Sequence, residues 1–145
     1  MRLRAIAIAL ALLNLAACAH VEPSASQADV RRFVDRFIRT VNEADVDGFV
    51  ACFAPNATAF FPSAANAARK AGAAEIRAAV TPTFSRGRPA SPVEPRDLEI
   101  TIDGLTALVT FVAGWNNDVA RRTLVLTRAS GDWQIVHLHA SNSSR

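Results

Sequence analysis

The chain has 145 residues, half of them hydrophobic, with 16 Lys and Arg against 13 Asp and Glu. Two of the basic residues, Arg2 and Arg4, stand ahead of an apolar run from Ala5 to Leu13, a signal-peptide pattern too short for a stable membrane anchor. Without these two residues the charges are 14 against 13, which argues against a nucleic-acid partner and against binding to an acidic membrane surface.

The segment Leu15-Ala16-Ala17-Cys18 follows the apolar run and resembles the bacterial lipobox. In lipoproteins with this motif the cysteine is acylated and becomes the first residue of the mature chain. The alternative is an ordinary secretory signal with an incidental cysteine. We expect residues 1–17 to be a lipoprotein signal peptide and Cys18 to carry the lipid. The expected location is the bacterial cell envelope, facing the periplasm, and Ala19 favours the outer membrane.

The mature chain is predicted to hold one domain, residues 29–142, behind a short polar tether at residues 18–28. If Cys18 carries lipid, Cys52 is the one remaining cysteine and no internal disulfide can form. Cys52 lies in an apolar helical run, which favours a buried structural thiol over a nucleophile.

The first half of the domain has helical periodicity. Ser26 and Asp29 resemble a capping box at the start of the first helix. The apolar stripe of that helix consists of Val30, Phe33, Val34, Phe37, Ile38 and Val41. Asp45 is predicted to cap a second, short helix.

A strand and a third helix are predicted next. Residues 57–61 are strand-like and stop at Pro62. The third helix is predicted over residues 73–80, and Pro82 is expected to end or kink it.

From Val93 onward the apolar spacing changes to two, which predicts four antiparallel strands. Asp103-Gly104 is a strong hairpin signal, and further turns are predicted over residues 116–119 and at Ser130-Gly131. Helices followed by a long antiparallel sheet form an α+β pattern, in which the helices cover one face of the sheet. A pocket is expected between the two layers.

The predicted turns set a register for these strands, because side chains alternate between the two faces. The expected pairs are Leu126 with Ile135, Leu124 with His137, Arg122 with His139, Phe111 with Leu124 and Ala113 with Arg122. This register places Trp115, Arg122, His137 and His139 at the polar end of one face. We expect that face to be the inner one, where it would line the pocket.

The last strand carries a family resemblance. Residues 133–141 (WQIVHLHAS) resemble the closing strand of SnoaL-like proteins and are similar to that of the calmodulin-dependent kinase association domain, both of the nuclear transport factor 2-like superfamily. The segments that resemble ketosteroid isomerase without a gap are Arg36-Phe37-Ile38 through Asn42, Asp45-Val46-Asp47-Gly48, Phe53-Ala54 and Ala57-Thr58. The resemblance implies a cone-shaped barrel of a curved antiparallel sheet wrapped around three N-terminal helices, with a deep pocket. It also implies a homodimer through the outer sheet face.

The departures from ketosteroid isomerase concern its chemistry. That enzyme uses an aspartate base and a tyrosine that stabilises the oxyanion. In the ungapped alignment Phe61 holds the base position and Phe37 the tyrosine position, and the chain contains no tyrosine. A phenyl ring cannot transfer a proton, so isomerisation by that mechanism is not expected. The resemblance implies that both rings line the pocket.

Three polar residues remain as candidates for the pocket. Arg122 could pin a carboxylate, and His137 and His139 could contact a ligand, act as a general base, or be structural hydrogen-bonding groups. No metal site and no cofactor are predicted, because a third metal ligand is missing and His20 lies in the tether.

Two functions from different classes fit these observations. The first is a lipid-anchored module, without enzymatic activity, that binds a small, partly apolar ligand or serves as a dimeric scaffold. The second is a small-molecule isomerase, cyclase or dehydratase that uses His137 or His139 as general base. The absence of a buried acid–base pair favours the first, and the sequence leaves the choice open.

Overall fold

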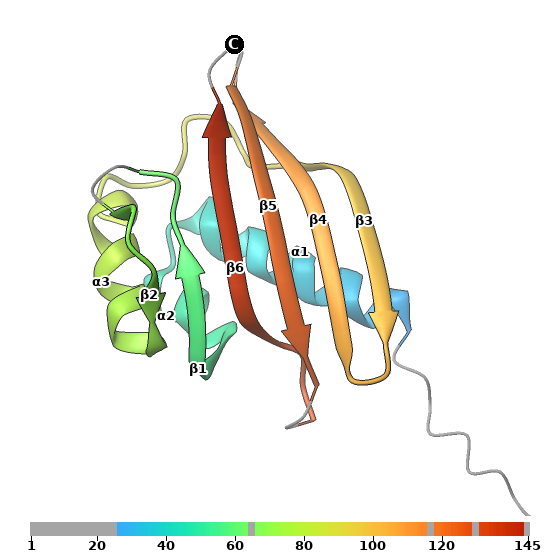
Figure 1. Cartoon of the computed structure of the whole chain (residues 1–145). Helices are drawn as coiled ribbons and strands as arrows, with labels where there is room; N and C mark the ends of the chain where they lie inside the picture. The colour runs from blue at the N-terminus through green and yellow to red at the C-terminus, as the bar shows by residue number, and fades with distance from the viewer. Residues whose placement is uncertain (1–25, 64–65, 116–117, 129–130, 144–145) are drawn as a thin grey trace, which may run out of the picture.

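The computed structural model describes residues 26–63, 66–115, 118–128 and 131–143, in which one layer of helices packs on one face of a curved sheet (Figure 1). The helices are α1 (Gln27–Glu43), α2 (Val46–Ala51) and α3 (Gly72–Phe84). The strands are β1 (Phe53–Phe60), β2 (Lys70–Ala71), β3 (Pro95–Asp103), β4 (Thr106–Trp115), β5 (Asp118–Thr127) and β6 (Gln134–Ser143). The proposed signal peptide and Cys18 lie outside the described residues. Among the described helices, none combines the length and apolar character that crossing a membrane requires.

The capping box at the start of α1 is confirmed. The Ser26 hydroxyl accepts a hydrogen bond from the Asp29 N–H at 3.2 Å, and the Asp29 carboxylate accepts one from the Ser26 N–H at 3.2 Å. The apolar stripe faces the sheet, and Val30 and Val34 are completely buried. Local capping and burial of one helix face therefore place α1 as the sequence predicts.

The α1–α2 junction depends on Asp45, which caps α2 as predicted. Its carboxylate accepts a hydrogen bond from the Gly48 N–H at 2.9 Å. A Cβ at position 48 would overlap that carboxylate, so only glycine fits there without displacing the cap.

α3 continues past its predicted end at residue 80 and includes Pro82. The helical hydrogen bond from the Ser85 N–H to the Thr81 carbonyl, 2.9 Å, closes the turn around the proline. The last residue of the helix, Phe84, packs on Phe49 with ring centroids 5.3 Å apart. A proline disturbs the helical turn before it more than the turn after it, so the helix can continue past Pro82. The contact of the Phe84 ring with Phe49 stabilises this extra turn.

The sheet has the strand order β2-β1-β6-β5-β4-β3. Strands β3 to β6 form the predicted antiparallel meander, and the Asp103-Gly104 hairpin joins β3 to β4. β1 pairs with β6 in parallel, and the sheet is curved but not closed. The predicted α+β fold of a curved sheet against three helices is confirmed, with an open cone and one parallel strand pair where a closed antiparallel barrel was expected.

The β4–β5 register differs from the expected one by two residues. Trp115 pairs with Asp118, so two residues and not four separate the strands, and Arg122 lies opposite Phe111. A shift of two preserves the face on which each side chain lies. Phe111 and Leu124 therefore remain on the inner face as predicted.

A β-bulge in β6 overturns the predicted placement of the two histidines. Leu126 pairs with Ile135 as expected, but the next pair is Val125 with His137, which leaves Val136 as an extra residue. A bulge of one residue exchanges the two faces of the strand that follows. His137 and His139 consequently lie on the outer face of the sheet, and the prediction that they line the pocket was wrong.

A candidate ligand-binding cavity

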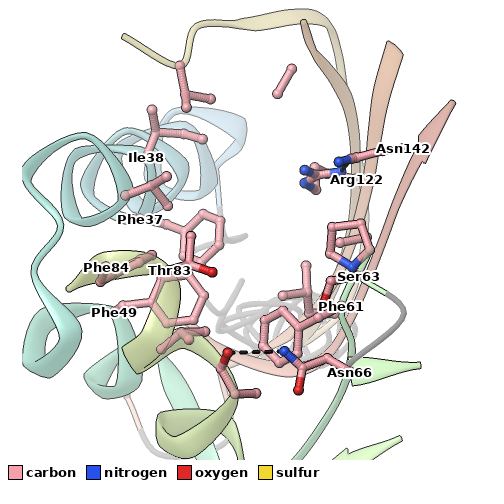
Figure 2. Close-up of a pocket in the computed structure, with 18 of the residues that line it drawn as sticks. Phe37, Ile38, Phe49, Phe61, Ser63, Asn66, Thr83, Phe84, Arg122 and Asn142 are labelled. Carbon is pink, nitrogen blue, oxygen red and sulfur yellow. Dashed lines mark hydrogen bonds between the residues drawn. The ribbon is translucent and has the colours of Figure 1, made fainter. Parts of the chain in front are cut away.

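A cavity of about 330 Å³ lies between the helices and the inner face of the sheet. Figure 2 shows side chains from α1, α2 and α3 on one side of it, and those of the sheet and of Phe61, Ser63 and Asn66, which follow β1, on the other. Its walls are mainly apolar and include Phe37, Ile38, Phe49, Phe61, Phe84 and Leu138. Cavities of this size and character hold small molecules in many proteins.

An aromatic cluster forms the helix side of the cavity. The ring of Phe37 is 5.2 Å from that of Phe49, and Phe49 is 5.3 Å from Phe84, measured between centroids. Phe37 is only 4% exposed. Tilted and edge-on aromatic contacts at these distances are favourable, so the cluster provides a firm apolar wall.

Arg122 is the one charged residue among the described residues that line the cavity. Its Nη1 donates hydrogen bonds to the Arg121 carbonyl at 2.8 Å, the Ser141 carbonyl at 3.1 Å and Asn142 Oδ1 at 3.2 Å. Desolvation lowers the pKa of the guanidinium to about 10, which still leaves it cationic at neutral pH. No carboxylate of the described residues forms an ion pair with it.

The other polar lining groups are neutral. Asn142, Ser63, Thr83 and Asn66 also line the cavity, and Asn66 Nδ2 donates to the Ala79 carbonyl at 3.1 Å. The described lining residues include no Asp, Glu, His, Lys or Cys. The cavity can therefore bind and orient a molecule, but these walls offer no group suited to general acid–base catalysis at neutral pH.

Of the residues predicted to form the pocket, Phe37, Phe61 and Arg122 do line the cavity. The side chain of Trp115 and the residue Cys18 lie outside the described part of the structure. In the described residues, no three His, Cys, Asp or Glu side chains gather in a way that could hold a metal ion.

The two histidines belong to the outer face. His137 Nδ1 lies 2.8 Å from the Thr58 hydroxyl, and His139 is exposed. The Phe60 ring packs near both, with its centroid 6.0 Å from that of His137 and 5.8 Å from that of His139. These contacts link β1 to β6 on the side of the sheet opposite to the cavity.

Sequence reasoning missed Asn142 and Val93 as cavity residues. The inward position of Asn142 follows only from the bulge at Val136, which has no clear sequence signal. Val93 is placed by Asn42, whose side chain accepts from the Val93 N–H at 2.7 Å and donates to its carbonyl at 3.1 Å. Asn42 thus fixes the segment before β3 to the end of α1.

Cys52 is buried, as predicted, and its thiol donates to the Gly48 carbonyl at 3.4 Å. Burial raises the pKa of this thiol, which disfavours the reactive thiolate.

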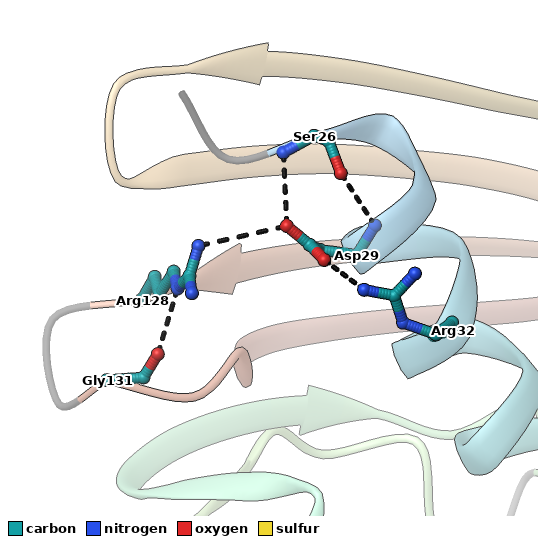
Figure 3. Close-up of polar contacts among 5 residues, drawn as sticks. All are labelled: Ser26, Asp29, Arg32, Arg128 and Gly131. Carbon is teal, nitrogen blue, oxygen red and sulfur yellow. Dashed lines mark hydrogen bonds and ion pairs between the residues drawn. The ribbon is translucent and has the colours of Figure 1, made fainter. Parts of the chain in front are cut away.

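A group of residues joined by hydrogen bonds and ion pairs lies at the start of α1, and we call it the α1 clasp: Ser26, Asp29, Arg32, Arg128 and Gly131 (Figure 3). Asp29 forms an ion pair with Arg32 and lies 3.9 Å from Arg128 Nη1. Arg128 Nε also donates to the Gly131 carbonyl at 2.9 Å. The clasp holds the first turn of α1 against the β5–β6 connection.

The sequence matches the family model of the SnoaL-like domain over residues 30–143. The chain belongs to the SnoaL-like family. No curated protein sequence is significantly similar to this SnoaL-like protein.

Solved structures support the same fold. An NTF2-like protein of unknown function from Pseudomonas putida is 23% identical, with a TM-score of 0.68 over 79% of this chain and 84% of that one. A provisionally assigned dehydratase of the NTF2-like family from Streptomyces avermitilis is 15% identical, with a TM-score of 0.65 over 80% and 95%. A provisionally assigned ketosteroid isomerase from Parabacteroides distasonis is 16% identical, with a TM-score of 0.64 over 79% and 85%. At these identities the likeness concerns the fold alone.

Proposed function

We propose that this SnoaL-like protein is an exported, lipid-anchored domain that binds a small, partly apolar molecule in the cavity between helices and sheet. The observation that carries the proposal is the cavity of about 330 Å³ with aromatic walls and few polar groups. Apolar cavities with a small number of polar contacts are typical of small-molecule sites.

Binding without catalysis is the function that the lining residues favour. Phe61 and Phe37 stand where ketosteroid isomerase has its base and its oxyanion donor, and neither ring transfers protons. His137 and His139, the alternative candidates for a general base, lie on the other face of the sheet. Two structural relatives are assigned as a dehydratase and an isomerase. The described residues of this cavity include no acid–base group for a reaction of either kind.

The anchoring part of the proposal rests on the lipobox-like segment that ends at Cys18. The tether would enter the domain at Ser26, which belongs to the α1 clasp. The cavity is lined by the later part of α1, which includes Phe37 and Ile38. A domain anchored in this way to the outer membrane would have its attachment point and its cavity at different parts of α1.

A homodimer through the outer sheet face is part of the same proposal. Leu108 of β4 is 44% exposed on that face, and Val125 lies opposite it on β5. Sedimentation velocity of the domain should give a dimer, and Leu108→Glu should shift it toward the monomer. A wild-type domain that sediments as a monomer at all concentrations would contradict this part.

Native mass spectrometry of the protein purified from its own envelope tests the binding function. We expect one small molecule per domain in the wild type. Ala113→Phe, which places a ring in the cavity, should lose it, whereas Val112→Phe, one residue away on the outer face, should keep it. Equal retention by both variants would mean that the molecule binds elsewhere.

A further inference from the structure

The guanidinium of Arg122 has hydrogen-bond donors that the described protein atoms do not use. Nη1 contacts three oxygen atoms, but no oxygen of the described residues accepts from Nη2 or Nε. A guanidinium has five N–H donors in one plane and accepts no hydrogen bonds. Figure 2 shows the end of this side chain turned into the cavity, across from Phe37 and Ile38.

A partly buried cation without a counter-charge is unfavourable, because desolvation is not compensated by an ion pair. The side chains around Arg122 in the cavity are apolar or neutral, and none of the described residues supplies a carboxylate. The missing negative charge must therefore come from solvent ions or from a ligand.

We infer that the molecule bound in the cavity is a monocarboxylate with an apolar body, and that Arg122 holds its carboxylate; this inference rests on the proposed binding function. The free Nη2 and Nε edge of a guanidinium matches the two oxygens of a carboxylate in a bidentate pair. The three contacts at Nη1 fix the plane of the guanidinium, so this edge is oriented before the ligand arrives.

Asn142 adds a neutral donor beside the same position. Because a guanidinium can only donate, the amide oxygen of Asn142 must face Nη1, 3.2 Å away. Its amide nitrogen makes no hydrogen bond to the described residues and is available to the ligand. One cation and one amide suit a single carboxylate better than a doubly charged phosphate group.

The rest of the cavity selects an apolar body. Phe37, Phe49, Phe61 and Phe84 supply aromatic surface away from Arg122 (Figure 2). The volume of about 330 Å³ accommodates a bicyclic ring or a short acyl chain. The ligand class is thus an aromatic or short aliphatic monocarboxylic acid.

The test uses two matched pairs of probes, 2-naphthoate with 2-naphthamide and octanoate with octanamide. Each pair has the same apolar body and differs in its charge. Isothermal titration calorimetry of the full domain should show the carboxylate binding at least about tenfold more tightly than its amide.

The variants are chosen to separate charge recognition from folding. Arg122→Met should remove the preference for the carboxylate but keep binding of the amide, and Arg122→Lys should weaken the preference without abolishing it. Arg121→Met is the matched control, because Arg121 is the neighbouring residue on the outer face, where it donates to Ser143 Oγ at 3.2 Å. It should bind both probes like the wild type. Thermal unfolding of each variant verifies that binding is compared between folded proteins.

The outcomes distinguish the two proposals. If the wild type binds each amide as tightly as its carboxylate, or if Arg122→Met retains the preference, the carboxylate inference is wrong while the cavity remains a binding site. If the wild type binds none of the four probes, the proposed binding function and the inference fail together.

Discussion

The Thr58 hydroxyl and His137 Nδ1 lie 2.8 Å apart and join β1 to β6 on the outer face of the sheet. This hydrogen bond spans the one parallel pair of the described strands. It gives His137 a structural role, because the side chain is tied to the neighbouring strand and turned away from the cavity.

His137→Ala should therefore lower the free energy of unfolding by about 1 kcal/mol, the usual worth of a hydrogen bond of this kind. Urea denaturation measures this change. Binding of 2-naphthamide per folded molecule should stay as in the wild type. His139→Ala is the control, since His139 is exposed and makes no hydrogen bond with the described residues, so a smaller loss is expected. If His137→Ala loses ligand binding, His137 contributes to the binding site and its role is not only structural.

Phe37→Ala should be strongly destabilising, because the ring is 4% exposed and packs on Phe49. We expect a loss of about 3–5 kcal/mol in the free energy of unfolding. Phe61 is partly exposed at the cavity, so Phe61→Ala should be milder and should mainly weaken ligand binding. If Phe37→Ala loses less than about 1 kcal/mol, the aromatic wall is not packed as described.

Deletion of Val136 tests the bulge in β6. Without the extra residue, Ile135 and His137 become consecutive, and ordinary alternation keeps Leu138 inward and His137 outward, in the same pairing with β5. We expect the deletion to keep the pairing of β5 with β6 and to lower the free energy of unfolding by about 1 kcal/mol, through loss of the partly buried Val136 side chain. Val136→Ala keeps the bulge and should lose about 1 kcal/mol. A deletion variant that loses about 3 kcal/mol or more would show that the strand needs the extra residue for its pairing.

Asp29 predicts a specific pH dependence of stability. Hydrogen bonds from the backbone and the side chain of Ser26, with a contribution from Arg32 and Arg128, hold the pKa of Asp29 below its usual value of 3.8. A carboxyl whose pKa is lowered in the folded state stabilises the fold above its unfolded pKa. This stabilisation is lost as the pH falls through the lowered folded pKa.

The melting temperature of Asp29→Asn should accordingly lie below that of the wild type at pH 7, and the two should converge as the pH falls below 3.8. Thermal unfolding followed by circular dichroism over this range provides the comparison. Asp35→Asn is the control, because Asp35 is an exposed residue of α1 without a hydrogen bond or ion pair to the described residues. A constant gap between Asp29→Asn and the wild type at all pH values would contradict the assignment.

Cys18→Ser tests the lipid anchor. Because acylation needs the thiol, the variant should either remain uncleaved or leave the membrane fraction. Cell fractionation with intact-mass measurement distinguishes these results from wild-type behaviour. Cys52→Ser, which changes the buried thiol, should fractionate like the wild type. If Cys18→Ser migrates and fractionates like the wild type, the protein is not a lipoprotein.

Local signals in the sequence determined most of the secondary structure. The capping box at Ser26, the cap at Asp45 and the Asp103-Gly104 hairpin all depend on residues within a few positions of one another, so the sequence alone predicts them. The buried faces of α1 and of strands β4 and β5 follow from residue spacing in the same way. The resemblance to ketosteroid isomerase correctly placed Phe37 and Phe61 in the cavity wall.

Tertiary structure alone decided which polar residues of β6 reach the cavity. The alternation of faces along β6 is interrupted at Val136, where the strand adapts to both of its neighbours, and nothing local in the sequence marks this position. The interruption turns His137 and His139 outward and Asn142 inward, beside Arg122. Periodicity predicts the face of a residue only as far as the hydrogen-bond register is continuous, and that continuity depends on how distant strands pair.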